Sequence, residues 1–204
     1  LHLPLPKAMH QKFQKSLQSL SAWRERAFIL SLAERALPNA LLYLNSLNSD
    51  ASLDPGICDD VWQSLILEPD EQGIVELLDE IISYMPDTEN AEHYGALPTF
   101  ECLSLFEQAL LSGVNEEKRR SLDASQASVN TVTQFIEFSE GEGLSENKLS
   151  KLFDAHPLVA REFSFQEELI DLLRPATHPG EALIHELRQL AQDEGVSNIG
   201  ISLS

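Results

Sequence analysis

Glu34 and Arg35 are a charged pair placed where chemistry could occur, because they directly follow a nearly continuous apolar run at 27–33. A helix that is apolar all round lies at the centre of a fold, so the pair could form a buried functional site. The alternative is a pair at the end of a helix that reaches solvent. We favour the alternative, since charged side chains are rarely buried unless they are paired.

A second group of reactive residues surrounds Gly95. His93 and Tyr94 precede this glycine, and Glu101 and Cys102 follow on the next predicted helix. Cysteine, histidine and a carboxylate could form a nucleophilic site if they converge. The local sequence ECLSLF is simply amphipathic, however, and cysteine is often a small buried apolar residue. We therefore favour a structural Cys102, and expect that Gly95 permits a tight turn.

Histidines near the C-terminus raise the question of a metal. His178, Glu181 and His185 have the spacing of one helix face. The spacing is neither HExxH nor the ExxH of di-iron bundles, and there is no second matching motif. We favour an exposed face and expect no bound metal and no cofactor. The sequence also has no P-loop, GxGxxG or GxSxG motif, so nucleotide binding and α/β-hydrolase chemistry have no support.

The acidic stretch 36–117 contains no lysine or arginine and 17 carboxylates. A local field of one sign repels phosphate and attracts cations or a basic partner, so nucleic-acid binding is not expected. Clustered carboxylates could also hold Ca²⁺ or Mg²⁺, but no DxDxDG loop is present. We favour solvated helix faces, followed by recognition of a basic partner, which includes mimicry of DNA. The sequence does not decide whether this stretch is functional.

The elements that position these residues are predicted to be helices. In 71–85, apolar residues recur at helical spacing with carboxylates on the opposite face, which predicts an amphipathic helix with a buried stripe before Pro86. Caps, prolines and glycines set the other boundaries. The predicted helices are 21–37, 39–47, 55–65, 71–85, 98–113, 115–140, 145–153, 157–173 and 178–195. Residues 199–201 are the candidate for a short extended tail.

Composition limits the class of protein. With 204 residues and 43% hydrophobic side chains, the chain is expected to form a single all-α domain over 1–204, a compact bundle of about nine helices. Two cysteines, Cys58 and Cys102, make no disulfide framework and fit a reducing cytoplasm. No apolar run approaches the ~18 residues of a membrane span, so no membrane contact is expected. The first dozen residues are expected to be peripheral or a tag.

Residues spread along the chain carry a family resemblance. They are Trp23, Phe28, Glu34, Arg35, Pro38, Asn39, Trp62, Pro86, Tyr94, Gly95, Pro98, Cys102, Ser125, Ser128, Thr131, Val132, Pro157, Glu162 and the tail Ser197–Asn198–Ile199–Gly200–Ile201. In this order they resemble the YjaG-like family, a bacterial family of unknown function, over about 15–203. The resemblance implies a cytoplasmic helical protein, and it brings no activity or catalytic residues.

These observations favour a non-enzymatic helical interaction protein with an acidic surface. Its partner would be a basic protein or a second copy of the chain. The alternative is an enzyme or small-ligand binder with a pocket near Glu34, Arg35, Tyr94 and Cys102. With Asn198 of the tail, these residues form the candidate functional surface.

Overall fold

The structure, a computed structural model, describes residues 4, 6–7, 11–47 and 53–203. These residues form nine α-helices, and their only β-structure is a single bridge between Val196 and Ser202. The helices are α1 (Gln11–Gln18), α2 (Ala22–Ser46), α3 (Pro55–Leu67), α4 (Glu71–Ser83), α5 (Ala96–Val114), α6 (Ser121–Ile136), α7 (Glu146–Ala155), α8 (Pro157–Leu173) and α9 (Glu181–Gln192). A π-helical turn, η1 (Glu137–Gly141), follows α6, and a 3-10 turn, η2 (Asp193–Gly195), follows α9. The predicted all-α class is confirmed.

Helix α2 runs through the middle of the fold and passes Pro38 without ending. The predicted break between 21–37 and 39–47 is therefore wrong. Proline removes one backbone hydrogen bond from a helix, but α2 packs against α3, α5, α6, α8 and α9, and this packing holds the helix on both sides of Pro38. As a result Glu34 and Arg35 lie in mid-helix rather than near its end.

Helix α1 was not predicted, whereas the two predicted helices 21–37 and 39–47 are one helix, α2. The predicted and observed numbers of helices agree only because these two errors cancel. Phe13 and Leu17 of α1 are buried, and the Phe13 ring meets Phe163 of α8 edge-on at 5.9 Å. Two other predicted boundaries are wrong. Asn115 ends α5 instead of capping the next helix, and α9 begins at Glu181 rather than near His178.

Helices α2 and α5 are antiparallel neighbours along their whole length. The Cys102 thiol of α5 reaches the Ala33 carbonyl of α2. Gly113, at the C-terminal end of α5, lies against Arg26 near the start of α2. Gly95, just before α5, lies against Tyr43 near the end of α2, where a Cβ would come within 2.9 Å of the tyrosine ring. This pairing fixes which residues of the two helices can meet.

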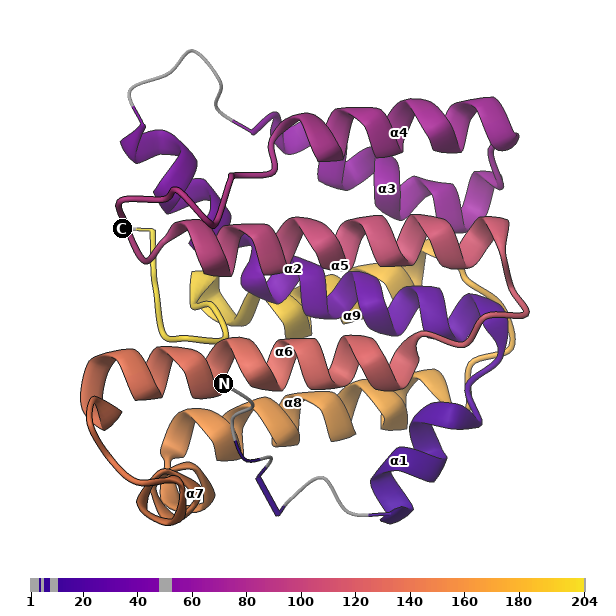
Figure 1. The fold of residues 1–204 in the computed structure, drawn as a ribbon. Coiled ribbons are helices and arrows are strands. Elements are labelled where there is room, and N and C mark those ends of the chain that lie inside the picture. Colours follow the sequence, from indigo (N-terminus) through magenta and orange to yellow (C-terminus); the bar gives the residue numbers. More distant parts are fainter. Residues whose placement is uncertain (1–3, 5, 8–10, 48–52, 204) are drawn as a thin grey trace.

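The remaining helices are stacked on either side of this pair. Figure 1 shows α3 and α4 at one end of the stack, α6 and α8 on the other side of α2 and α5, and α1 and α7 beyond them. Helix α4 contacts α5 and α3 and leaves its outer face uncovered within the described residues. The predicted buried stripe of this helix is only partly correct, because Ile74 and Ile81 are buried whereas Ile82 is exposed.

Among the described helices, α2 alone is long and apolar enough to meet the length and composition criterion for a membrane span. The prediction that no apolar stretch approaches that length is corrected by this result. In the fold, 72% of its most apolar window is buried against other helices. A central core helix meets the same criterion, so the result is weak support for a membrane span.

Candidate functional site

The Glu34 carboxylate is buried, with 3% of the residue exposed, and it accepts hydrogen bonds from three side chains. Trp62 Nε1 of α3 donates at 2.7 Å and Gln192 Nε2 of α9 at 2.8 Å. Arg188 of α9 donates through Nε at 3.3 Å and Nη2 at 3.2 Å. A buried charge is tolerated when it is paired and hydrogen-bonded, and both oxygens of Glu34 meet this condition.

Arg188 connects this buried carboxylate to the surface. Its Nη1 lies 2.7 Å from the exposed Asp59 carboxylate, and its guanidinium lies 5.9 Å from the centre of the Trp62 ring. Burial lowers the pKa of Arg188, but Glu34 and Asp59 outweigh burial and raise it overall. We call Glu34, Trp62, Arg188 and Gln192 the Glu34 cluster.

Arg35 is buried to the same extent but lies on another side of α2. Its Nε is 3.7 Å from Glu162 of α8, and its Nη1 is 3.7 Å from Asp193 of η2. The guanidinium lies over the Phe165 ring, 4.2 Å from its centre. Arg35 Nε and Glu162 Oε2 are both buried without a hydrogen-bond partner. Burial lowers the pKa of Arg35, although Glu162 acts in the opposite direction.

The other oxygen of Glu162 belongs to a chain of polar contacts between α6 and α8. Ser128 Oγ donates to Glu162 Oε1 at 2.5 Å, and Gln166 Nε2 donates to it at 2.8 Å. Ser125 Oγ in turn donates to Gln166 Oε1 at 2.5 Å. All four side chains are buried, so the carboxylate of Glu162 is held in place independently of Arg35.

Asn198 belongs to the C-terminal tail, which folds back onto α2 and α8. Its Oδ1 accepts from Asn39 Nδ2 at 2.9 Å, one turn beyond Arg35. Arg161 of α8 donates to the Ser197 carbonyl at 3.2 Å and pairs with Asp193. We call Arg35, Glu162, Asp193, Arg161 and Asn198 the Arg35 cluster.

Cys102 lies beside the Glu34 cluster, but as a protonated thiol. Its Sγ donates to the Ala33 carbonyl at 3.4 Å. Burial raises the pKa of Cys102 well above its usual value, with smaller contributions from Cys58 and Glu34. Burial likewise raises the pKa of Cys58 to about 12. Since the thiolate is the nucleophilic form, both thiols are poorly suited to attack a substrate.

Tyr94 does not join the other predicted residues. Its ring stacks on Phe138 of η1, with centroids 4.3 Å apart, and burial raises its pKa to about 12. The adjacent Gly95 lies against Tyr43, nine residues from Glu34, which is about 13 Å along the helix. The structure thus brings Glu34 and Cys102 together, places Arg35 and Asn198 in a second cluster, and leaves Tyr94 apart.

The histidines predicted to share a helix face do not do so. His178 precedes α9, whose N-cap is Gly180, and His178, Glu181 and His185 are all exposed. No group of three histidine, cysteine or acidic side chains suited to a metal occurs among the described residues. The expectation that the chain binds no metal stays a prediction.

Sequence reasoning missed the partners of Glu34 and Arg35. Arg188 and Gln192 are four residues apart, a spacing that places them on one face of α9. Arg161 likewise lies one helical turn after Pro157, on the same face of α8. No spacing in the sequence indicates that these faces meet α2. The interpretation of Glu34 and Arg35 as a solvent-reaching pair is wrong, because α2 continues and covers both.

A different candidate surface lies on α4. Val75 and Ile82, one above the other at i and i+7, are 41% and 46% exposed, and the half-buried Leu78 lies between them. The exposed carboxylates on this helix are Glu71, Glu76, Asp79 and Glu80. Glu71 and Asp79 lie three or four residues from Val75 or Ile82 and so neighbour them on the helix surface. We call Val75, Leu78, Ile82, Glu71 and Asp79 the α4 face.

Comparison with known proteins gives a family. A family model described as "Protein of unknown function (DUF416)" matches residues 12–202. The chain belongs to the DUF416 family. This confirms the YjaG-like resemblance, since the uncharacterized protein YjaG of Escherichia coli K12 is 26% identical over 189 residues, covering 91% of this chain and 93% of that protein.

Two further comparisons cover nearly the whole chain. An uncharacterized protein of Haemophilus influenzae is 27% identical over 198 residues, 95% of this chain and 98% of its own length. The crystal structure of a DUF416 family protein from Shewanella baltica OS155 has a TM-score of 0.79 at 26% identity, covering 93% of this chain and 97% of that one. Membership of the DUF416 family supports the helical fold of this chain, and the family description names no activity.

Proposed function

We propose that this protein is a helical interaction protein whose α4 face binds a basic, amphipathic helix of another protein. The observation that carries the proposal is the exposed pair Val75 and Ile82, with the exposed carboxylates Glu71 and Asp79 beside it on the helix surface. An amphipathic helix recognises such a surface through apolar anchors at i and i+7, with charges around them. Lysines flanking those anchors would meet Glu71 and Asp79.

Charge favours a basic partner over a second copy of this chain. The α4 face lies within the stretch 36–117, which has no lysine or arginine. Two copies meeting face to face would bring like charges together, which opposes association. Nucleic acid is disfavoured for the same reason, since its binding requires cations that neutralise phosphate. As part of the proposal we expect the protein in the cytoplasm, where its two free thiols would stay reduced.

The test uses a synthetic helical peptide with leucines on one face and lysines on the other, followed by fluorescence anisotropy. The double variant V75S/I82S should weaken binding roughly tenfold or more, since about 1.4 kcal/mol of apolar contact is lost. A peptide with glutamines in place of the leucines should bind the native protein about as weakly. Binding should also fall with added salt.

The matched control neutralises carboxylates elsewhere on the surface. Glu142 and Glu146 are exposed near the start of α7, so E142Q/E146Q should bind the leucine–lysine peptide as the native protein does. E71Q/D79N should weaken it. Equal weakening by the two charge variants would contradict the proposal, because binding would then follow total charge only. A dimer in sedimentation that V75S/I82S abolishes would instead favour self-association.

A pocket for an enzyme or ligand binder near Glu34, Arg35, Tyr94 and Cys102 has less support. The oxygens of Glu34 are occupied by protein donors, the Cys102 thiol is protonated, and Tyr94 lies elsewhere. The interaction proposal needs none of these residues.

A further inference from the structure

Arg26 of α2 lines a hollow between α2, α3, α4 and α5 with a volume of about 200 Å³. Exposed carboxylates, Glu68 and Glu116, contribute to its lining, and Ser64 adds a hydroxyl. The remaining lining residues are mainly apolar: Pro69, Ile74, Ala109, Leu110 and Gly113. The hollow therefore combines one cation, two anions and an apolar wall in a small volume.

The guanidinium of Arg26 has no hydrogen bond or ion pair among the described residues. Its Nε is fully buried without a partner. The other seven arginines of the chain each have an ion pair or a hydrogen bond. Buried polar groups are nearly always hydrogen-bonded, so an Arg26 guanidinium without a protein partner is unusual. Because Arg26 also lines the hollow, its N–H groups other than Nε are available to a group supplied from outside.

Gly113 makes the position of Arg26 possible. A Cβ at residue 113 would lie 2.9 Å from Arg26 Nη1, closer than real Cβ contacts allow. The guanidinium thus lies directly against the α5 backbone, with its buried Nε beside it. This arrangement differs from a surface arginine whose side chain extends freely into water.

The lining determines the chemistry of the ligand. A guanidinium presents a planar fork of donors that matches a carboxylate. Glu68 and Glu116 would repel a second negative charge and attract an ammonium group. Ser64 Oγ donates to the Val61 carbonyl at 2.6 Å, so its lone pairs remain available to an N–H donor. We propose that this hollow binds a small zwitterion, an α-amino acid with a short apolar side chain.

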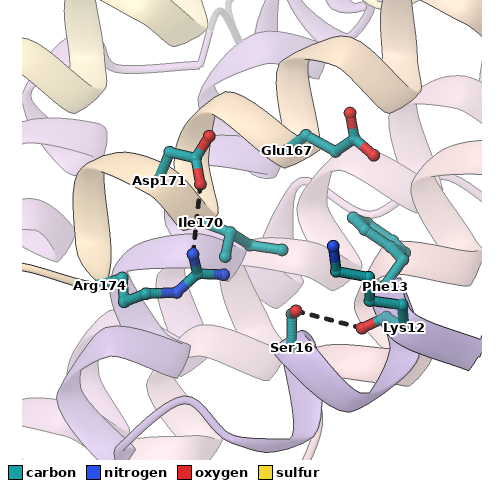
Figure 2. A pocket seen from close by; sticks show the side chains of 7 residues that line it. All are labelled: Lys12, Phe13, Ser16, Glu167, Ile170, Asp171 and Arg174. Atoms are coloured by element: carbon teal, nitrogen blue, oxygen red, sulfur yellow. Dashed lines mark hydrogen bonds and ion pairs between the residues drawn. The ribbon is translucent and has the colours of Figure 1, made fainter.

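A second hollow of about 240 Å³ between α1 and α8 provides the comparison (Figure 2). It is lined by a similar set of charges, including Lys12, Glu167, Asp171 and Arg174. There the guanidinium is already paired, because Arg174 Nη1 lies 3.6 Å from Asp171. The two hollows differ because Arg174 has an ion-pair partner and Arg26 has none in the described part of the chain. A substitution of Arg174 therefore serves as the control.

The test is a titration followed by two-dimensional NMR, with L-valine, 3-methylbutanoate and 2-methylpropan-1-amine as probes. The last two keep the branched carbon skeleton of valine but lack its ammonium group or its carboxylate. We expect L-valine to bind best, with shifts at Gly113 and Ile74. R26M should weaken valine binding at least about tenfold, equal to ~1.4 kcal/mol, and R26K should weaken it less.

Two controls keep the outcome clear. R174M should leave valine binding unchanged, and E68Q/E116Q should remove the preference for valine over 3-methylbutanoate. Thermal melts show which variants are folded, and R26K provides the test if R26M is not. The inference is overturned if no probe binds the native protein at tens of millimolar, or if R26M and R26K bind valine as the native protein does. It does not depend on the proposed partner of the α4 face.

Discussion

Glu34 and Arg35 are neighbours on α2, equally buried at 3% exposure, yet their surroundings differ. In the Glu34 cluster, donors from Trp62, Arg188 and Gln192 lie within 3.3 Å of the carboxylate. In the Arg35 cluster, the two carboxylates lie 3.7 Å away, and Nε has no hydrogen bond. The charged partners raise the pKa of Arg188 overall, whereas the pKa of Arg35 is lowered.

The difference shows that burial alone does not tell how firmly a charge is held. A carboxylate accepts bonds from several directions, so donors from two helices, α3 and α9, can converge on Glu34 of α2. The guanidinium of Arg35 must match fixed acceptors, and Glu162 is already held by Ser128 and Gln166. We infer that the Glu34 cluster fixes α2, α3 and α9 together, and that the Arg35 cluster is the looser of the two.

The largest expected effect is that of E34A. This substitution leaves Arg188 partly buried without its inner carboxylate and leaves Trp62 Nε1 buried without an acceptor. Breaking a buried pair from one side costs about 3–5 kcal/mol, so the free energy of unfolding should fall by that amount in urea denaturation.

The control for E34A removes the outer partner of the same arginine. D59N removes the charge of the exposed Asp59 carboxylate, 2.7 Å from Arg188. Exposed ion pairs contribute about 0–1 kcal/mol, so its effect should be several times smaller. Equal losses for E34A and D59N would show that Glu34 is no better held than a surface carboxylate.

Most of the fold could be predicted from the sequence because its helices have local signals. The helix starts predicted at Pro55 and Pro157 appear in the structure. The errors arise where tertiary packing overrides local preference. Pro38 lies inside α2 because helices pack against both halves of it, and α1 is short, with only Phe13 and Leu17 buried.

The clusters were predictable only in part. Glu34, Arg35, Cys102 and Asn198 were singled out, but their grouping depends on contacts between residues more than 60 positions apart, such as Cys102 with Ala33 and Asn39 with Asn198. Helix periodicity gives the face of a residue, not the helix that the face meets. Arg26 likewise lies against Gly113, in a packing contact that no local pattern encodes.

A smaller effect is expected for R35M. Methionine keeps an apolar side chain over Phe165, and Glu162 retains its bonds from Ser128 and Gln166. The free energy of unfolding should fall by about 2 kcal/mol, less than for E34A. In a double-mutant cycle of R35M and E162Q, the coupling free energy between Arg35 and Glu162 should stay below about 1 kcal/mol. A coupling as large as the E34A effect would show that the two clusters are held alike.

The smallest effect is expected at Asp193, where the Arg35 cluster reaches the tail. Asp193 has a positive φ of 41°, a conformation that asparagine tolerates well, so D193N removes the charge and leaves the backbone unstrained. Arg35 and Arg161 then lose a shared, 44% exposed carboxylate. Such a pair contributes about 1 kcal/mol or less, which corresponds to roughly fivefold faster opening of the tail.

Hydrogen exchange measures how often the tail opens, at the amides of Ser197 and Gly200. The Ser197 amide donates to the Ile201 carbonyl at 2.8 Å, and the Gly200 amide donates to the Ser197 carbonyl at 3.0 Å. Amides in the middle of α2 should be unchanged, because their exchange requires opening of the core. E194Q is the matched control, since Glu194 also has a positive φ and has no ion pair among the described residues. If E194Q speeds exchange as much as D193N does, total charge near the tail, and not the link from Asp193 to Arg35 and Arg161, holds the tail in place.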